Sequence, residues 1–467
     1  MTVPTPAPHI DDSRISQALA AGPGLVEPRQ VREILQKAKE LKGLSRDDVV
    51  PLLGVTDPEL LGELFRTAGE VKQAIYGNRI VLFAPLYISN LCANECDYCA
   101  FRVSNRALDR RVLSQQEIAE EVRWLVDHGH KRLLMVAGEA MPHDGFDYYL
   151  KAIDTIYATR TERGEIRRVN VNLAPLEVEQ FTALKARNIG TYQLFQETYH
   201  RPTYAQVHKF GRKADYDWRL GAIDRAMQAG IDDCGVGVLF GLHDWRYELL
   251  ALMQHIDHLE DAWGVGPHTI SMPRLEPADG SELASHPLAP LGDTDFLKLI
   301  AILRMAVPYT GLILSTRETP EIRRAAFRLG VSQISAGSVT NPGGYAHPEN
   351  QVAGQFSLGD HRSLDEVVRD VLQLGFVPSF CTACYRLGRT GRDFMDLAKP
   401  GEIKTHCLPN ALATLQEYLQ DFAGADTLQA GELRIAEDLD VIDEPKLRRR
   451  AGRMVEAVRA GKHDVFC

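Results

Sequence analysis

The sequence predicts an α/β protein: a (β/α)8 TIM barrel with a helical N-terminal extension and a C-terminal extension. Three observations predict this fold. Eight short apolar runs are spread over residues 80–338, a longer segment with helical spacing follows each of them, and the length of 467 residues leaves room for flanking regions. Alternating strands and helices form a parallel sheet, and eight such units close naturally into a barrel. A doubly wound open sheet is the alternative that alternation alone leaves open.

The first 78 residues are expected to form a helical extension. Polar segments with helical spacing alternate there with Pro/Gly breaks, as in GPGLVEP and GVTDPELLG. From Arg79 onward the pattern changes to short apolar runs. We therefore divide the chain into an N-terminal extension (1–78), a barrel (79–376) and a C-terminal region (377–467).

The expected strands are apolar along most of their length, which is typical of parallel strands buried on both faces. They are residues 80–89, 132–139, 167–174, 189–197, 234–242, 268–276, 310–317 and 331–338. Among the expected helices, the clearest begins with a capping box at Ser114 and Glu117 and is closed by a glycine. An eighth helix, 363–375, follows the last strand. The Gly/Asn-rich segment 339–362 is expected to be a loop over the carboxyl mouth of the barrel, where the strands end.

Charge and hydropathy exclude several classes of protein. The chain has 53 basic and 63 acidic side chains, a formal net charge of −10, which argues against a nucleic-acid binder. No uninterrupted apolar run reaches about 18 residues, so no membrane span is expected. The first residues, MTVPTPAPHIDDS, lack the basic and apolar regions of a secretory signal. We expect a cytoplasmic protein, in which clustered cysteines are more often metal ligands or catalytic thiols than disulfides.

Three of the eight cysteines lie in the motif CANECDYC, directly after the first expected strand. Cys92, Cys96 and Cys99 have the spacing CxxxCxxC. Three thiolates on one loop can hold three irons of a 4Fe–4S cluster and leave the fourth iron open to a substrate or cofactor. Zinc, the alternative, usually takes four ligands arranged in CxxC pairs. The motif therefore predicts an iron–sulfur cluster with an open iron.

A second group of three cysteines follows the barrel. Cys381, Cys384 and Cys407 have the spacing CxxC-x22-C, which also suits a cluster with an open iron. A zinc site completed by His406 or His347 is the alternative here.

Topology indicates where the second group lies. The helix 363–375 must run antiparallel to the last strand, so the chain returns to the amino mouth of the barrel, where the strands begin, just before Cys381. With about 3.3 Å of rise per residue, the two groups are expected on the order of 25 Å apart. His268 begins the sixth expected strand and should lie at the amino mouth too, where it is either a ligand of an additional metal or a structural residue. Something small must then diffuse between the two centres.

CxxxCxxC at the end of the first strand of such a barrel resembles the radical S-adenosylmethionine (SAM) superfamily, which implies a radical SAM barrel. In that family the open iron binds SAM, and reductive cleavage gives a 5′-deoxyadenosyl radical. The resemblance implies that Gly138 and Glu139 meet the SAM amino group, Glu197 the ribose hydroxyls, Arg219 the SAM carboxylate and Tyr98 the adenine. All but Arg219 follow expected strands on the catalytic face. Solvated side chains at strand ends are the alternative. Asn170 and Asn172 share one side of their strand, where they line the barrel or simply form hydrogen bonds.

The two cysteine groups, together with NRIVLFAPLYIS, QLFQETYH, VGPHTIS and PSFCTACYR, closely resemble the HydG-type tyrosine lyases of FeFe-hydrogenase maturation. The similarity covers about residues 30–425. It implies cleavage of the Cα–Cβ bond of L-tyrosine to p-cresol and dehydroglycine, and conversion of dehydroglycine to CO and cyanide at the C-terminal cluster. It further implies two 4Fe–4S clusters, the C-terminal one with an additional iron held by His268, and SAM. Partners would be a reductant of the flavodoxin or ferredoxin type and other hydrogenase maturation proteins with a scaffold, with no nucleic acid and no membrane.

The carboxylate of tyrosine requires a cation near the carboxyl mouth. Arg317, which ends the seventh expected strand, is our choice, and Arg323 is the competitor, expected to be a surface residue of a helix. The segment HKFGRKADY (208–216) departs from the proline-containing segment expected there. Cys234 is expected to be buried and inert, and Cys467 to lie at the surface.

Two kinds of rival function are kept open. One is a related enzyme: a tyrosine lyase for thiazole (thiamine) biosynthesis, which would give p-cresol without CO or cyanide, or a sulfur-inserting enzyme like biotin synthase. The other is an iron–sulfur scaffold or carrier, which would transfer clusters without cleaving SAM.

Overall fold

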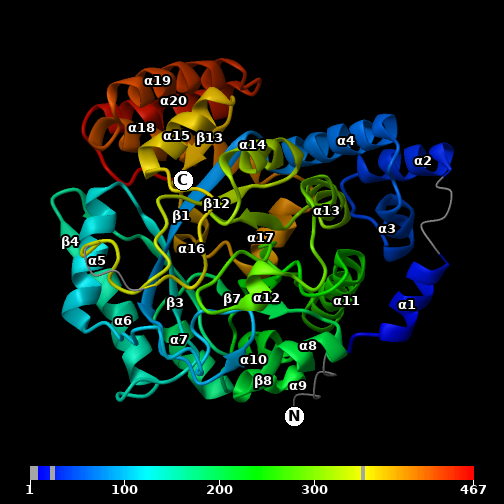
Figure 1. Ribbon diagram of the computed structural model, residues 1–467. Helices are drawn as coiled ribbons and strands as arrows, with labels where there is room; N and C mark the ends of the chain where they lie inside the picture. The colour runs from blue at the N-terminus through cyan, green and yellow to red at the C-terminus, as the bar shows by residue number, and fades with distance from the viewer. Residues whose placement is uncertain (1–8, 22–26, 349–352) are drawn as a thin grey trace, which may run out of the picture.

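Eight parallel strands close into a barrel because the last strand pairs with the first. The computed structural model describes residues 9–21, 27–348 and 353–467 (Figure 1). Parts of the expected N-terminal extension (1–8, 22–26) and of the expected loop 339–362 (349–352) lie outside that description. The barrel strands are β1 (Arg79–Ser89), β3 (Arg132–Ala137), β6 (Arg168–Asn172), β7 (Tyr192–Glu197), β9 (Cys234–Val238), β10 (Thr269–Ser271), β11 (Gly311–Leu314) and β12 (Gln333–Ser335). Closure through the β12–β1 pair confirms the predicted barrel and excludes the open sheet.

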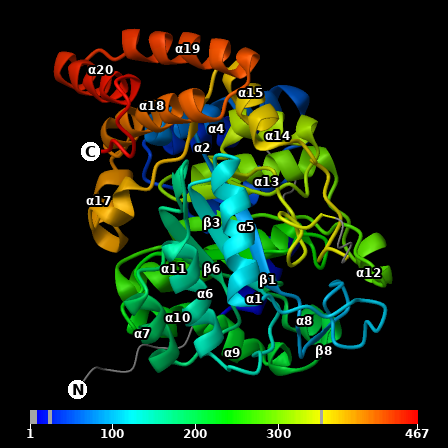
Figure 2. The same ribbon diagram turned by 90° about the vertical axis from the view of Figure 1, so that its left-hand side faces the viewer.

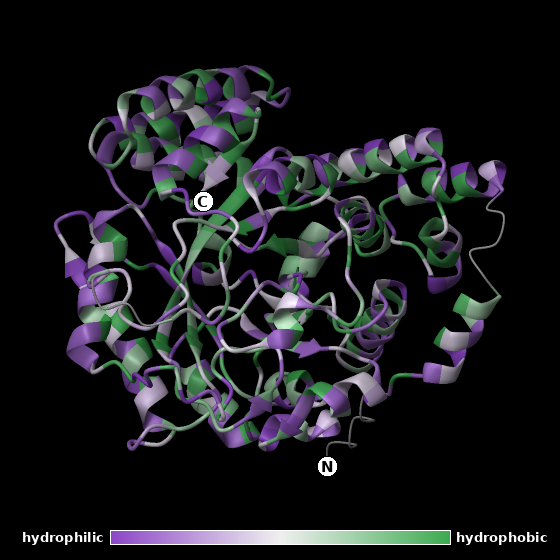
Figure 3. Cartoon of the chain, in the orientation of Figure 1, coloured by the Kyte–Doolittle hydropathy of each residue, from purple (hydrophilic) through white to green (hydrophobic). Residues whose placement is uncertain are grey.

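Helices form the outer layer of the barrel, and several of them begin with a capping side chain. Helix α5 (Gln115–Asp127) has the predicted capping box of Ser114 and Glu117, and the strands it covers are buried on both faces. In Figure 3 the long strand β1 is apolar along most of its length, while the outer helices alternate between polar and apolar residues. The remaining helices of the barrel region are α6 (Asp147–Ala158), α7 (Val178–Ala186), α8 (Arg201–Val207), α9 (Tyr216–Leu220), α10 (Ala222–Gln228), α11 (Trp245–Trp263), α12 (Glu282–Ser285), α13 (Asp293–Ala306), α14 (Pro320–Leu329) and α15 (Leu364–Gln373).

Seven of the eight barrel strands are shorter than the apolar runs that predicted them, and β10 and β12 are the shortest. The run 268–276 contributes only the three residues of β10, because the chain reaches Pro273, which has no N–H to donate to a ladder. The run 331–338 contributes only β12, and Gly337 then turns the chain with φ 55°. At both places the sequence remains apolar beyond the last paired residue of the strand, because the loop that follows is buried as well.

A ninth strand, β13 (Val377–Ser379), was not predicted. It pairs in parallel with the first residues of β1, from Arg79↔Val377 to Val81↔Ser379, before β3 takes over from Ala84 onward. The three residues Val-Pro-Ser are too few, and a proline is too unfavourable in a ladder, to give a strand signal. The expected C-terminal region thus begins as part of the barrel sheet.

Two sets of helices flank the barrel. The N-terminal set is α1 (Asp12–Ala20), α2 (Pro28–Ala38), α3 (Arg46–Leu53) and α4 (Pro58–Tyr76), of which α1 packs on α11 and α4 on α13. The C-terminal set is α16 (Ala383–Arg386), α17 (Gly391–Ala398), α18 (Lys404–Asp421), α19 (Ala425–Asp440) and α20 (Pro445–Arg459). Figures 1 and 2 show α18, α19 and α20 stacked beside α15 and β13, at the end of the barrel where the strands begin. None of the helices in the described part of the chain combines the length and apolar character that a membrane crossing requires.

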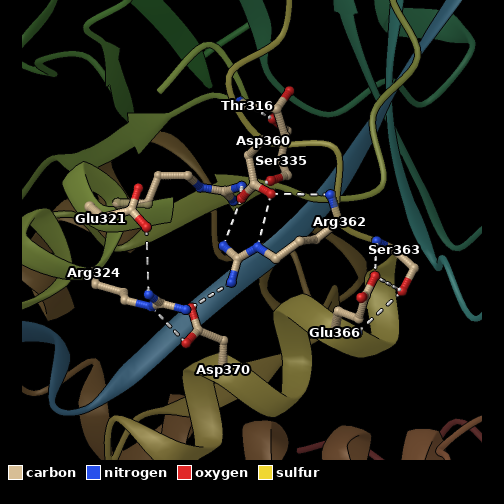
Figure 4. A network of polar contacts seen from close by, with 10 residues as sticks. Thr316, Glu321, Arg324, Ser335, Asp360, Arg362, Ser363, Glu366 and Asp370 are labelled. Atoms are coloured by element: carbon tan, nitrogen blue, oxygen red, sulfur yellow. Dashed lines mark hydrogen bonds and ion pairs between the residues drawn. The ribbon is translucent and has the colours of Figure 1, made fainter. Parts of the chain in front are cut away.

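A buried ion-pair network fixes the segment before α15 to the carboxyl mouth. Asp360 pairs with Arg323 and Arg362, and Asp370 pairs with Arg324 and Arg362; Figure 4 shows Asp360, Arg362, Asp370 and Arg324. Arg323 is fully buried, so the expectation that it is a surface residue is wrong. The periodicity of its helix does not reveal that a distant carboxylate neutralises it.

Candidate functional site

The first cysteine group lines a cavity at the carboxyl mouth. Its loop follows β1 and is held by a short antiparallel pair between β2 (Glu95–Cys96) and β8 (His208–Phe210). The same cavity contains every residue to which the resemblance gave a SAM contact, together with the choice for the tyrosine carboxylate. These residues are Cys92, Cys96, Cys99, Tyr98, Gly138, Glu139, Glu197, Arg219 and Arg317. The structure therefore brings together residues that lie up to 225 positions apart, from Cys92 to Arg317.

Gly138 allows the cysteine loop to approach the end of β3. Its N–H donates to the carbonyl of Ser89 at 2.8 Å, and a Cβ at position 138 would lie 2.3 Å from the carbonyl oxygen of Leu91. That oxygen belongs to the backbone just before Cys92 and cannot rotate away. A residue without a side chain is required here to seat the loop.

We expect Gly138→Ala to destabilise the protein by about 2 kcal/mol or more, because the new methyl group displaces backbone. The free energy of unfolding in urea measures this effect. Gly452→Ala is the matched control: its Cβ would meet nothing within 4 Å inside helix α20, so it should be neutral or slightly stabilising. Equal stability of the two variants would contradict the role given to Gly138.

Two carboxylates and two cations lie together in this cavity. Arg219 Nη1 donates to Glu139 Oε1 at 2.9 Å, and its Nη2 lies 3.6 Å from Glu197 Oε1. Lys213 Nζ donates to the same Glu197 oxygen at 2.7 Å, and Asn94 Nδ2 donates to Glu139 Oε2 at 2.9 Å. Arg219 was the only candidate for a SAM contact that was not expected to follow a strand, and the structure places it in the same site.

Lys213 is a site residue that sequence reasoning missed. It lies in the segment 208–216, which stood out only as a departure from the expected pattern. Burial disfavours its charge, but Glu197, Cys96 and Glu139 outweigh burial and raise the pKa of the ammonium group. The pKa of Glu139 is lowered, because Arg219 and Lys213 outweigh the opposing effect of burial. The site therefore holds both signs of charge at neutral pH.

The end of β7 is bent so that Glu197 faces this cavity. Glu197 has φ 71°, a left-handed conformation that residues other than glycine rarely adopt, and the β7–β9 register shifts between Phe195 and Glu197. The bulge interrupts the alternation of sides along the strand. A strained backbone with a buried carboxylate is typical of a functional position.

The cysteine thiols and Tyr98 are set apart from solvent. Burial raises the pKa of the thiols of Cys92, Cys96 and Cys99, so a bound cation would be needed to stabilise their thiolates. The hydroxyl of Tyr98 lies 2.8 Å from Nε2 of His208, which leaves the ring, not the hydroxyl, to face a ligand. Three thiols with Lys213 nearby fit an iron–sulfur cluster.

Arg317 is half-buried in the cavity and has no carboxylate partner in the part of the chain that the structure describes. Its guanidinium lies 3.3 Å from the centroid of the Phe356 ring, and its Nη1 lies 3.5 Å from the carbonyl oxygen of Arg274. Burial lowers its pKa. Of the two asparagines, Asn172 lines the same cavity, whereas Asn170 accepts a hydrogen bond from the N–H of Thr191.

The second cysteine group lies at the amino mouth. Cys381 follows β13, Cys384 is in α16 and Cys407 is in α18. A hydrogen bond from the thiol of Cys407 favours the thiolate of Cys384 and lowers its pKa, while burial raises the pKa of Cys381 to about 11. From Val81, opposite Ser379, to Ser89, β1 rises by about 26 Å, so the two groups lie at opposite ends of one strand.

His268 lies one residue before β10, at the same mouth. It is buried, its Nδ1 has no hydrogen-bond partner among the described residues, and burial lowers its pKa, so the ring is neutral. Nδ1 lies 3.7 Å from a carboxylate oxygen of Asp233, and the ring centroid lies 6.0 Å from that of Tyr385, the residue after Cys384. A neutral imidazole with a free nitrogen suits a metal ligand.

The histidines of the zinc alternative have other contacts. His406 Nδ1 lies 3.4 Å from Arg389, and His347 Nε2 lies 3.2 Å from Glu120 in α5. Within residues 9–21, 27–348 and 353–467, no three His, Cys, Asp or Glu side chains are arranged to bind one metal ion. Cys234 is buried as expected, whereas the expected surface residue Cys467 is partly buried, with its N–H bonded to Asn410.

Two family models match the chain. The radical SAM superfamily matches residues 86–256, and the Biotin and Thiamin Synthesis associated domain matches residues 271–377. Together they cover most of the barrel. Neither reaches Cys381, so the second cysteine group lies outside both.

The similar proteins extend over more of the chain. The 2-iminoacetate synthase of Escherichia coli is 33% identical over 361 residues, 77% of this chain and 92% of that protein. A crystal structure of HydG, described as a maturase of the [FeFe]-hydrogenase, is 48% identical with a TM-score of 0.94, covering 98% of this chain and 99% of that one. The HydG structure from Carboxydothermus hydrogenoformans is 39% identical with a TM-score of 0.82, covering 95% and 98%. The solved structures, unlike the synthase, thus match the chain almost from end to end.

Proposed function

The chain belongs to the radical SAM superfamily and, within it, to the HydG type of [FeFe]-hydrogenase maturase, and on this premise we propose that it is a tyrosine lyase that forms CO and cyanide. The proposed reaction breaks the Cα–Cβ bond of L-tyrosine to give p-cresol and dehydroglycine. The dehydroglycine anion, HN=CH–COO⁻, then divides into cyanide, CO and one water, which balances its atoms and charge. These products would serve assembly of the hydrogenase active site.

The observation that carries the proposal is the second group of three cysteines. A lyase that released dehydroglycine would need only the site at the carboxyl mouth. Cys381, Cys384 and Cys407 lie at the other mouth of the same barrel, beyond both family models. His268, with a free imidazole nitrogen, lies at that mouth too. A second centre of this kind suits a second reaction on a product of the first.

The residues at the carboxyl mouth fit a cluster and SAM. When bound, a reduced 4Fe–4S cluster and SAM supply a 5′-deoxyadenosyl radical, and Cys92, Cys96 and Cys99 would hold that cluster. The carboxylates of Glu139 and Glu197 suit the amino group and ribose hydroxyls of SAM. Arg219 suits its carboxylate, and Tyr98 its adenine. Cys96, Tyr98, Glu197 and Arg219 are buried and the other groups are partly buried, which limits access of water to the reacting atoms.

The groups at the amino mouth would hold the second cluster. Cys381, Cys384 and Cys407 supply three thiolates, and His268 would hold the additional iron through its free nitrogen. A carboxylate oxygen of Asp233 lies 3.7 Å from this same nitrogen, Nδ1, and would add negative charge beside the bound cation.

Arg317 is proposed to bind the carboxylate of tyrosine. It is a half-buried guanidinium in the SAM cavity with no ion pair among the described residues. We expect Arg317→Gln to raise KM for tyrosine at least about tenfold, since a charge-assisted pair is lost. Initial rates of p-cresol formation measure this. Arg201→Gln, an exposed arginine paired with Asp217, is the control and should leave KM unchanged. An unaltered KM in the Arg317 variant would remove Arg317 from the substrate site.

The experiment that tests the function is one assay with four products. Reduced, reconstituted protein with SAM and L-tyrosine should yield 5′-deoxyadenosine, p-cresol, CO and cyanide. p-Cresol without CO would indicate a thiazole-pathway lyase instead, the function suggested by the similarity to 2-iminoacetate synthase. Cluster transfer without 5′-deoxyadenosine would indicate a carrier. A flavodoxin or ferredoxin would supply the electron, and other maturation proteins would receive the product.

A further inference from the structure

Three neighbouring strands of the barrel each begin with an arginine. Arg79 opens β1, Arg132 opens β3 and Arg168 opens β6, and these strands are adjacent in the sheet. Arg132 and Arg168 are paired in register, so their side chains point to the same side. Three arginines therefore lie at the amino mouth, the end of the barrel that also holds the second cysteine group.

Two of these arginines are buried and Arg79 is half-buried, and none of the three has a carboxylate partner among the described residues. Arg132 is 5% exposed and Arg168 is 4% exposed, and the Nε atoms of Arg79, Arg132 and Arg168 have no hydrogen-bond partner among the described residues. Within the same residues, no carboxylate lies within 4 Å of any of the three guanidinium groups, Asp233 included. A buried cation costs free energy unless an anion accompanies it. The mouth is therefore built for an anion that the protein itself does not supply.

Arg168 is held in place and has little freedom to bind a ligand. Its Nη2 donates to the carbonyl of Ile189 at 2.6 Å, and its guanidinium stacks 3.7 Å from the centroid of the Tyr385 ring. A Cβ at Gly190 would lie 2.5 Å from its Nε, so the glycine makes room for it. Arg168 thus positions the ring of Tyr385.

Arg132 is the freer guanidinium. Its one hydrogen bond among the described residues runs from Nη2 to the hydroxyl of Tyr385, at 2.7 Å. That hydroxyl also lies 3.0 Å from Oγ1 of Thr191. Arg79, by contrast, lies near the three cysteines, whose negative forms raise its pKa against burial. The charge of Arg79 thus acts mainly on the thiolates, whereas the effect of Arg132 on Cys381 is smaller, so Arg132 is the arginine more available to a ligand.

We propose that Arg132 and the hydroxyl of Tyr385 form a binding site for a small carboxylate at the amino mouth. This inference rests on the proposed function and names the group that receives its intermediate, the carboxylate of dehydroglycine. Tyr385 lies between the arginine and His268, with ring centroids 6.0 Å apart, so a two-carbon acid held by Arg132 would reach the metal side of the site. Arg168 is a positioning residue for Tyr385.

Retention at this site decides between two fates of dehydroglycine. Held at the amino mouth, the anion divides into cyanide, CO and water. Released, its imine is hydrolysed: HN=CH–COO⁻ and water give glyoxylate, OHC–COO⁻, and ammonia. The ratio of CO to glyoxylate therefore reports on the site, whereas p-cresol reports only on the reaction at the carboxyl mouth.

We expect Arg132→Gln in the reconstituted holoenzyme to keep p-cresol formation within about twofold of wild type. CO should fall at least about tenfold, and glyoxylate should rise to replace it. Arg392→Gln, an exposed arginine of α17, is the charge-matched control and should change neither product. If the wild-type protein forms p-cresol and CO as proposed but the Arg132 variant keeps the same ratio of CO to glyoxylate, this inference is overturned and the proposed function is not. Absence of p-cresol from the wild type would overturn the proposed function instead.

A binding measurement tests whether Arg132 binds a ligand or only neutralises the charge of the C-terminal cluster. Glyoxylate titrated into the reduced holoenzyme should shift the electron paramagnetic resonance spectrum of the C-terminal cluster, and the Arg132 variant should need at least about ten times more glyoxylate for the same shift. Iron content is measured alongside. If Arg132→Gln loses that cluster, Tyr385→Phe decides. A full cluster with weakened glyoxylate binding supports the site, and unchanged binding overturns it.

Discussion

Cys92→Ala is expected to abolish formation of 5′-deoxyadenosine and p-cresol, by at least about a thousandfold relative to wild type. Its thiol is one of three that line the cavity at the carboxyl mouth, and three thiolates are the fewest that hold a cubane with a single open iron. Without that cluster no electron reaches SAM. Chromatography of both products after a fixed time measures the loss.

The control for this variant is another cysteine of the same chain. Cys234→Ala removes a buried thiol whose Sγ donates to the carbonyl of Ile231 at 3.5 Å, far in sequence from either group. It should retain p-cresol formation. An iron–sulfur carrier would behave differently: Cys92→Ala would still deliver the C-terminal cluster to an acceptor and would lack any catalytic defect. Residual p-cresol at the wild-type rate in Cys92→Ala would defeat the radical SAM assignment of this loop.

Cys384→Ala is expected to separate the two halves of the reaction. Its thiol is hydrogen-bonded by that of Cys407 at the amino mouth, about 26 Å along β1 from the first group. We expect p-cresol to continue within about twofold, while CO falls at least about tenfold because a cluster ligand is lost. p-Cresol and CO are measured on the same sample.

The reciprocal variant tests the same division from the other side. Cys92→Ala should keep the electron paramagnetic resonance signal of the C-terminal cluster and lose p-cresol, whereas Cys384→Ala should lose that signal and keep p-cresol. If Cys384→Ala formed CO at the normal rate, the division into two sites would be wrong.

The barrel could be predicted because its signals are local. Apolar runs of strand length, capping residues such as Ser114 and a regular alternation each specify one element without reference to the rest of the chain. The ninth strand could not be predicted in this way. Val377–Ser379 is a strand only because β1 begins five residues before β3 pairs with it and leaves a free edge, and no property of the three residues themselves records that edge.

The residues of the candidate site also differ in whether a local sequence signal predicts them. The spacing of the cysteines identifies them as ligands, and other candidates stand at the ends of expected strands. The sequence alone could therefore assign both kinds of residue to one mouth of the barrel. Lys213 and Arg323 depend on distant carboxylates, Glu197 and Asp360, which only folding brings near. The arginines at 79, 132 and 168 did leave a signal, one at the head of each of three apolar runs. Their meaning emerges only when the sheet places these strands next to one another and the register pairs Arg132 with Arg168.

The short strand β13 gives the two metal centres a common support. Cys381 follows a strand that lies on the first residues of β1, and Cys92 follows the last residues of that same β1. An insertion or a kink within these eleven residues would misplace both cysteine groups at once. Comparable damage to β9 or β11 touches neither loop directly. The length of β1 therefore sets the distance between the two cysteine groups, and a change in that strand would alter both centres together.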